Sequence, residues 1–227
     1  MKTVLITGST LIIFLGGIMK KINGIEIYEN LKEILNPERS CLVVWDVQNG
    51  LVSRIYNKTE FVSDIKYLIN ALRGKIPVVY TLITPAAKEF RSSWSYYTMM
   101  RRFGVDDPAK LPDFMAKGSS DRNILEDIAP QEGDILLEKP TASIFIGTYF
   151  EQMMKNRNIN TLIFTGIATE IGVESSARDA ANRGFYPVIA ENCVSSMDKE
   201  AHGRSLENMR KMFICENSKT IVENILN

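Results

Sequence analysis

Beyond about residue 40 the chain alternates short apolar runs with stretches of helical periodicity. The runs CLVVWDV at 41–47 and IPVVYTLI at 76–83 are rich in β-branched residues, which is typical of buried strands. In 58–73 apolar residues recur at helical spacing, and Gly74 follows the last turn. We therefore predict strands at 41–47, 76–83, 134–137, 161–165, 186–190 and 213–215, and helices at 58–73, 146–156, 170–183, 199–211 and, after a Ser218 cap, 219–226.

This alternation predicts the fold class. Strands that are apolar on both faces must be covered on both faces, and βαβ units give parallel strands joined by right-handed crossovers. We predict an α/β fold, a three-layer, doubly wound, mostly parallel sheet of about six strands, with ligands bound beyond the carboxyl ends of the strands. The segment 84–133 is too long for a plain loop, so we expect it to fold into helices that cover the site or contact another subunit.

Length and composition favour one domain. The chain has 227 residues, of which 45% are hydrophobic, and we assign 25–227 to a single domain and 1–24 to an N-terminal extension or arm. Residues 4–18 are mostly apolar between lysines, but are too few to span a membrane and lack a cleavage site. An export signal, a true start at Met19, and an N-terminal strand or arm remain open.

Charge and cysteine usage narrow the partners and the compartment. The 27 basic and 27 acidic residues cancel, which favours a small-molecule ligand over nucleic acid or a membrane. Cys41, Cys193 and Cys215 lie far apart without a CxxC pair, as expected of a cytoplasmic protein. No G-x-G-x-x-G follows the first main strand, so an NAD enzyme is not indicated.

Two charged residues stand at predicted strand ends. Asp46 follows a strongly apolar strand, where desolvation would raise its pKa toward acid or base work. Equally, with Asn49 and Gly50 close by, it could cap a turn. Lys139 follows the strand at 134–137 and could polarise Asp46 or balance charge on a substrate, although alone it is typical of a surface lysine.

Three segments together resemble the isochorismatase-like hydrolase superfamily, the cysteine hydrolases. They are Asp-x-Gln-Asn at 46–49, Lys-x-x-x-Ser-x-Phe at 139–145 and GIATEIGV at 166–173, and the resemblance covers about 40–215. It implies a catalytic set of Asp46, Lys139 and the position of the family cysteine, here Gly172, and a cis peptide between Ile167 and Ala168. We expect substrate contacts from Gln48, Asn49, Arg91, Trp94, Phe145, Ile167, Ala168 and Thr169, with Arg91 as a carboxylate clamp and Trp94 as an apolar wall.

Gly172 cannot supply the thiolate that this position would otherwise carry. The backbone N–H groups at the start of the following helix remain as a possible anion site. True isochorismatases resemble this chain in having glycine there and cleave an enol ether, but Ala168, Thr169 and Glu170 resemble the amidohydrolases instead. A ligand in the place of the thiol, or a left-handed backbone, would explain the glycine.

Other groups are weaker candidates. Cys193 ends a predicted strand two strands away from Asp46 and is better explained by packing. Nicotinamidases in the superfamily carry a metal site with an Asp and two His, whereas this chain has one histidine, His202, so we expect no metal and no cofactor. Ser175 and Ser176 favour close packing of helix on sheet.

We therefore predict a metal-independent hydrolase of a small organic molecule. It would cleave an enol ether or a C–N bond with Asp46 and Lys139 and without a cysteine nucleophile, as a homo-oligomer in the cytoplasm. The alternative is a catalytically silent relative that acts as a binding module or an oligomer scaffold.

Overall fold

The computed structural model describes residues 20–227, and the expectations about residues 4–18 lie outside them. Six parallel strands form one sheet in the order β5-β4-β3-β6-β7-β8. They are β3 (Ser40–Trp45), β4 (Val78–Ile83), β5 (Ile135–Lys139), β6 (Thr161–Ile167), β7 (Tyr186–Ser195) and β8 (Ile214–Glu216). This confirms the predicted fold class.

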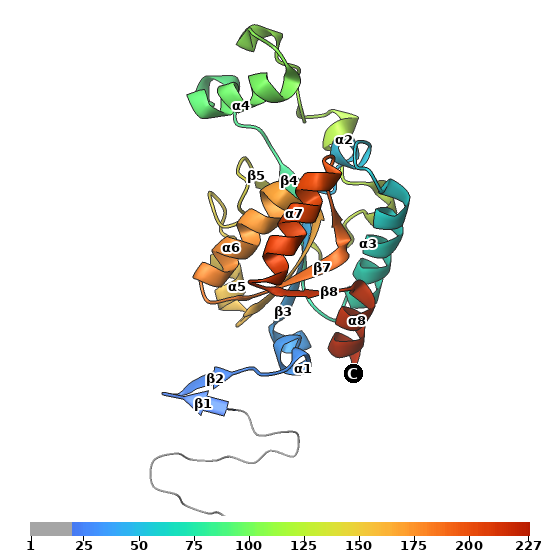
Figure 1. The fold of residues 1–227 in the computed structure, drawn as a ribbon, viewed down its shortest axis with the longest axis vertical. Helices are drawn as coiled ribbons and strands as arrows, with labels where there is room; N and C mark the ends of the chain where they lie inside the picture. Colours follow the sequence, from blue (N-terminus) through green and yellow to red (C-terminus); the bar gives the residue numbers. More distant parts are fainter. Residues whose placement is uncertain (1–19) are drawn as a thin grey trace, which may run out of the picture.

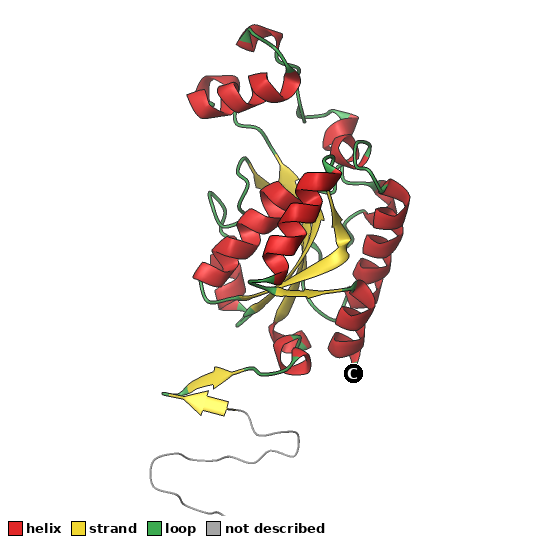
Figure 2. Ribbon diagram, in the orientation of Figure 1, coloured by secondary structure: helices red, strands yellow, loops and turns green. Residues whose placement is uncertain are grey.

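Helices cover both faces of the sheet (Figures 1 and 2). One face carries α3 (Lys58–Leu72) and α8 (Ser218–Leu226), and the other carries α5 (Phe150–Asn156), α6 (Glu174–Asn182) and α7 (Lys199–Arg210). Alternation along β3 divides its side chains between two apolar cores. Leu42 and Val44 belong to the core beneath α3 and α8, while Val43 and Trp45 belong to the core beneath α5, α6 and α7.

Several predicted boundaries need correction. β3 ends at Trp45 instead of residue 47, because Asp46 turns the chain with a φ of +44°. The helix predicted at 170–183 is two elements, a π-helical turn η6 (Thr169–Val173) and then α6. The helix predicted from 146 begins at Phe150, and the cap of α8 is Asn217, whose side chain accepts from two backbone N–H groups of the first turn.

The amino-terminal part of the described chain forms a hairpin, β1 (Lys20–Ile22) with β2 (Ile25–Ile27), which straddles the predicted boundary at residue 24. Short helices follow, namely α1 (Leu31–Ile34), η1 (Pro37–Arg39) and, after β3, α2 (Asn49–Val52). In residues 20–227 no helix has the length and apolar character needed to cross a bilayer.

The segment 84–133 is mostly irregular. Its one α-helix is α4 (Ser93–Phe103), accompanied by the 3₁₀ turns η2 (Lys88–Phe90), η3 (Pro108–Lys110), η4 (Ser120–Arg122) and η5 (Glu126–Ile128). Figure 1 shows α4 standing clear of the helices that flank the sheet, and none of its residues is buried. The later part of the segment packs on the carboxyl edge of the sheet, where Gln48 forms a β-bridge with Ile124.

Candidate active site

The candidate site lies where the chain reverses its direction of travel across the sheet. From the central strand β3 the chain continues to β4 and β5 on one side, and later to β6, β7 and β8 on the other. The carboxyl ends of β3 and β6 therefore flank a topological switch point, the usual position of a ligand in such sheets. Asp46 follows β3 there, and the turn that contains Gly172 follows β6.

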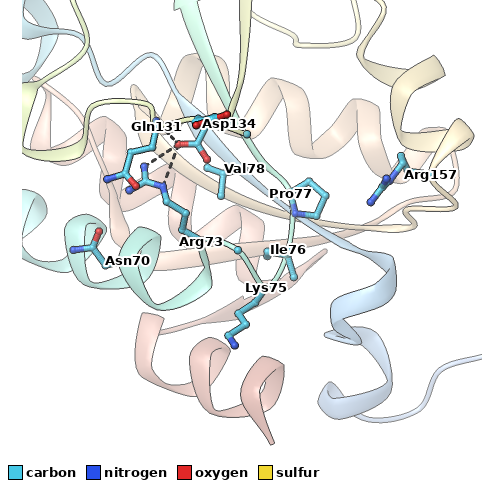
Figure 3. A pocket seen from close by; sticks show the side chains of 12 residues that line it. Asn70, Arg73, Lys75, Ile76, Pro77, Val78, Gln131, Asp134 and Arg157 are labelled. Atoms are coloured by element: carbon cyan, nitrogen blue, oxygen red, sulfur yellow. Dashed lines mark hydrogen bonds and ion pairs between the residues drawn. The ribbon is translucent and has the colours of Figure 1, made fainter.

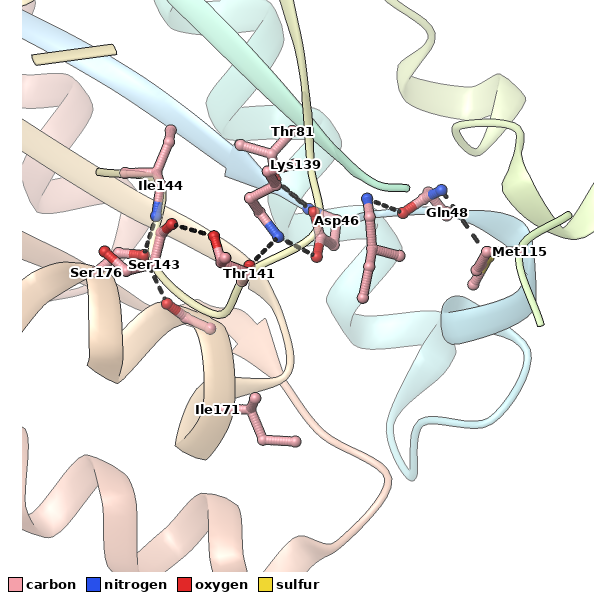
Figure 4. Close-up of polar contacts among 12 residues, drawn as sticks. Asp46, Gln48, Thr81, Met115, Lys139, Thr141, Ser143, Ile144, Ile171 and Ser176 are labelled. Carbon is pink, nitrogen blue, oxygen red and sulfur yellow. Dashed lines mark hydrogen bonds and ion pairs between the residues drawn. The ribbon is translucent and has the colours of Figure 1, made fainter. Parts of the chain in front are cut away.

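Asp46 is held by hydrogen bonds on both carboxylate oxygens (Figure 4). Its Oδ1 accepts from Thr81 Oγ1 at 2.5 Å, and its Oδ2 accepts from Lys139 Nζ at 2.7 Å. Thr81 Oγ1 in turn accepts from the backbone N–H of Asp46 at 3.0 Å. The left-handed φ of Asp46, which costs roughly 1 kcal/mol or more for a residue with a side chain, brings this carboxylate back over the strand end.

Lys139 reaches Asp46 from two strands away, across β4. Its side chain is 1% exposed and that of Asp46 is 5% exposed. Besides Asp46, the ammonium donates to the carbonyl oxygen of Thr141 at 3.2 Å and lies 3.6 Å from the centre of the Trp45 ring. The protein thus gives this cation a carboxylate, a carbonyl oxygen and an aromatic ring as partners.

Burial shifts both members of the pair toward neutrality. Desolvation raises the pKa of Asp46, and the opposing effects of the Lys139 charge and the two hydrogen bonds do not cancel it. Desolvation also lowers the pKa of Lys139, against the attraction of Asp46. A raised carboxyl pKa and a lowered ammonium pKa are what proton transfer near neutral pH requires.

The indole of Trp45 occupies the place where a side chain at position 172 would begin. A Cβ built on Gly172 would lie 1.8 Å from Trp45 Nε1 and 2.2 Å from Trp45 Cε2. Gly172 is not among the residues with a positive φ, so a left-handed backbone is not the reason for the glycine. Neither expected explanation applies, because a protein side chain, Trp45, fills this space.

The backbone of η6 offers fewer free donors than the sequence indicates. The N–H groups of Ile171, Gly172 and Val173 all point to the carbonyl oxygen of Ala168, at 3.2, 3.0 and 3.3 Å. The peptide between Ile167 and Ala168 is cis, as predicted. An anion at this turn would have to compete with the Ala168 carbonyl for those three groups.

Gln48 and Asn49 join the site to the segment that follows β4. The fully buried amide of Gln48 donates to Arg122 O at 2.8 Å and accepts from Ile83 N at 2.9 Å. Asn49 donates from its side chain to Ser120 O at 3.1 Å. These contacts fix the loop, and a substrate contact by either residue stays a prediction.

Arg91, Trp94 and Phe145, three further expected substrate contacts, have partners other than Asp46 in the structure. Arg91 donates to Ala86 O at 2.9 Å within its own loop, and Trp94 is 70% exposed, where it stacks on Tyr97. Phe145 packs on Phe150 in the core beneath α5. Substrate contacts by these three residues and by Ile167, Ala168 and Thr169 stay predictions.

Thr169 and His202 form a buried pair beside η6. Thr169 Oγ1 lies 3.1 Å from Ser195 O, to which it donates, and is hydrogen-bonded to Nδ1 of His202 at 2.8 Å. Desolvation lowers the pKa of His202, which favours the neutral ring. Both residues thus tie η6 to β7 and α7, which accounts for His202 by packing.

A cavity lies at the opposite edge of the sheet (Figure 3). It has a volume of about 730 Å³ and is lined by residues around the turns before β4 and β5. Arg73 and Asp134 pair in it at 2.9 Å. A cavity of about 490 Å³ lies nearer the candidate site, between 84–91 and 113–122, and includes Arg91 and Glu138.

Other reactive groups do not join the site. Burial raises the pKa of the Cys41 and Cys193 thiols, which makes them poor nucleophiles. Within 20–227 no three His, Cys, Asp or Glu side chains are grouped so as to hold a metal ion.

Trp45, Thr81 and Thr141 complete the site but are not indicated by the sequence patterns above. A signal for Trp45 does exist: it is the last residue of a buried strand, directly before Asp46, in a chain with glycine at 172. For Thr81 the signal is a polar residue inside the apolar run at 76–83. Neither pattern specifies what the side chain contacts.

Comparison with known proteins agrees with the geometry of the sheet and its edge. The isochorismatase domain family matches residues 40–215. The chain is 30% identical over 177 residues to ureidoacrylate amidohydrolase RutB of Cronobacter turicensis, covering 69% of this chain and 74% of that protein. It is 28% identical over 199 residues to the protein of the same name from Enterobacter sp. strain 638, covering 78% and 84%.

A solved structure shows the same fold. A cysteine hydrolase from Pseudomonas syringae pv. phaseolicola superposes with a TM-score of 0.71 at 19% identity, covering 83% of this chain and 93% of that one. The match of the isochorismatase domain over residues 40–215 shows that the chain belongs to the isochorismatase-like hydrolase family.

Proposed function

We propose that the chain hydrolyses a C–N bond of a small amide or ureide with Asp46 and Lys139, using water as the nucleophile and forming no covalent enzyme intermediate. The observation that carries this proposal is the buried ion pair, with its 2.7 Å contact at the carboxyl edge of the sheet. Burying two charges costs several kcal/mol each, and apolar residues of similar volume would serve stability at least as well. A buried ion pair that carries this cost, and in which both pKa values are moved toward neutral, favours a role in catalysis.

The proposed chemistry needs only this pair and water. Asp46, as carboxylate, takes a proton from water while the water oxygen bonds to the carbonyl carbon. Lys139 stabilises the negative charge that develops nearby. The proton on Asp46 then passes to the departing nitrogen, the C–N bond breaks, and the carboxylate is restored.

The substrate class is supported by two of the relatives, which are named as ureidoacrylate amidohydrolases. Glycine at 172 also suits enol-ether cleavage, in which protonated Asp46 would deliver its proton to carbon and water would attack the resulting cation. Isochorismate therefore belongs in any substrate screen. A homo-oligomer in the cytoplasm stays a prediction, and the exposed aromatic residues Phe90, Trp94 and Tyr97 support a subunit contact.

The second candidate is a silent pocket, and Trp45 is the observation that favours it. The ring fills the space that a side chain at position 172 would need, and the two charged side chains are at most 5% exposed. In that case the fold would bind a ligand or support an assembly without turnover.

A substrate screen separates the two candidates. Purified protein is incubated with ureides, amides and isochorismate, and products are detected by mass spectrometry, with Asp46→Asn as the paired control. Glu191→Gln serves as the matched carboxylate control, because Glu191 pairs with Arg210 on the surface. Turnover by the wild type and by Glu191→Gln, but not by Asp46→Asn, supports the hydrolase. Product formation no faster than the uncatalysed reaction in all three proteins would support the silent pocket.

A further inference from the structure

Trp45 is a large buried side chain at the centre of the site, and the proposed hydrolysis gives it no role. It ends β3, is 1% exposed and faces the core beneath α5, α6 and α7. Two observations meet at its ring. The Lys139 ammonium lies 3.6 Å from the ring centre, and a Cβ on Gly172 would overlap the ring edge.

The ammonium of Lys139 has three N–H donors to satisfy and almost no access to water. Asp46 Oδ2 takes one at 2.7 Å, and the carbonyl of Thr141, at 3.2 Å, takes a second. The face of an indole is the best aromatic partner for a cation, and its attraction grows when the cation is dehydrated. The ring thus supplies the third partner of the cation.

The space for this ring exists because position 172 has no side chain. The nearest ring atoms to a Cβ there would be Nε1, Cε2 and Cζ2 at 1.8, 2.2 and 2.6 Å, all far shorter than a van der Waals contact. No rotation about the Cα–Cβ bond of residue 172 moves its Cβ away from the ring. Trp45 and Gly172 therefore depend on each other sterically.

We propose that Trp45 is a positioning residue of this site: its indole takes the space of a side chain at 172 and provides the ring face that keeps the Lys139 ammonium charged and directed at Asp46. This role of Trp45 rests on the proposed function only in one respect, namely that the pair of Asp46 and Lys139 takes part in hydrolysis. Removing the ring while keeping the site dry should lower the proton affinity of Lys139, since the ring favours the charged form.

Few other groups act on this cation, so its titration is a usable readout. The turn after β3 contributes the charge of Asp46, and the loop after β5 contributes the Thr141 carbonyl. The neutral Thr81 of β4 donates to Asp46, and Gly172 of η6 faces the Trp45 ring. Besides burial, Asp46 is the group that shifts the pKa of Lys139.

The test follows the 13Cε signal of Lys139 by NMR against pH in lysine-labelled protein, with the signal assigned by its loss in Lys139→Met. In Trp45→Leu we expect the pKa of Lys139 to fall by about one unit, a tenfold loss of proton affinity. Trp45→Phe, which keeps a ring face, should retain most of it. Phe185→Leu is the matched control, because it removes a ring from the same core and should leave Lys139 unchanged.

Equal pKa values in wild type and Trp45→Leu would overturn the proposal and reduce Trp45 to packing. If Trp45→Leu does not fold, tryptophan fluorescence replaces the NMR titration. The chain has two tryptophans, so Trp94→Phe leaves Trp45 as the single emitter. Its emission should then rise when Lys139→Met is added, and unchanged emission would overturn the proposal. A shifted pKa without turnover in the substrate screen would keep the positioning role and reject the hydrolase.

Discussion

Gly172→Ala measures whether Trp45 decides the residue at this position. A Cβ would lie 1.8 Å from the indole nitrogen, and the ring would have to retreat by roughly 1.5 Å or more to reach ordinary contact near 3.5 Å. Inserting one methyl group into a packed core costs about 1–3 kcal/mol, and here the displaced ring also leaves Lys139. We expect Gly172→Ala to lower the free energy of unfolding by at least that amount in urea denaturation followed by circular dichroism.

The sign of the change in the free energy of unfolding distinguishes a clash with Trp45 from the ordinary effect of a Gly→Ala substitution. Gly172 has no left-handed φ, so without the ring an alanine there would stabilise the fold by about 0.4–1 kcal/mol through the unfolded state. Gly203, in α7, is the matched control: no atom outside its own helix lies within 4 Å of a Cβ there, and Gly203→Ala should stabilise.

A double-mutant cycle isolates the contact itself. Adding Gly172→Ala to Trp45→Leu should cost nothing or stabilise, although Trp45→Leu alone is destabilising. Gly172→Ala that is as stable as the wild type, or equally destabilising in both backgrounds, would refute the steric argument.

Three further outcomes are expected. Asp46→Asn should lower kcat about 100-fold or more, because a positioned acid or base contributes that much; steady-state kinetics on a substrate found by screening would decide it, and an unchanged kcat would remove Asp46 from the chemistry. In the pH profile of kcat/KM, burial raises the pKa of Asp46, so activity should be lost on acidification at a higher pH than an ordinary aspartate would give. Burial lowers the pKa of Lys139, so activity should be lost on the alkaline side at a lower pH than an ordinary lysine would give. Loss of activity at the ordinary pKa values would contradict both directions. The double variant Trp45→Val with Gly172→Cys should place a thiol beside Lys139 that reacts with iodoacetamide at neutral pH faster than the buried Cys41. A thiol that reacts no faster than Cys41 would show that the space beside Lys139 does not favour a thiolate.

Much of the framework is encoded locally in the chain. Apolar runs and helical spacing predict the six strands and the flanking helices, because each element must bury its own apolar side chains whatever lies next to it. The positions of Asp46 and Lys139 at strand ends follow from the same patterns. The limits of the elements follow less well: β3 stops at Trp45 because Asp46 turns left-handed to meet Thr81 and Lys139, and those partners are 35 and 93 residues away.

Tertiary structure alone decides what fills the site. The sequence shows that Gly172 lacks a nucleophile, but the reason for the glycine is the ring of Trp45, more than a hundred residues earlier in the chain. That contact depends on β3 and β6 lying side by side and on η6 bringing Gly172 down onto the strand end. Local propensity determines which residues form strands and helices, whereas close packing between distant segments determines which side chain occupies a given volume.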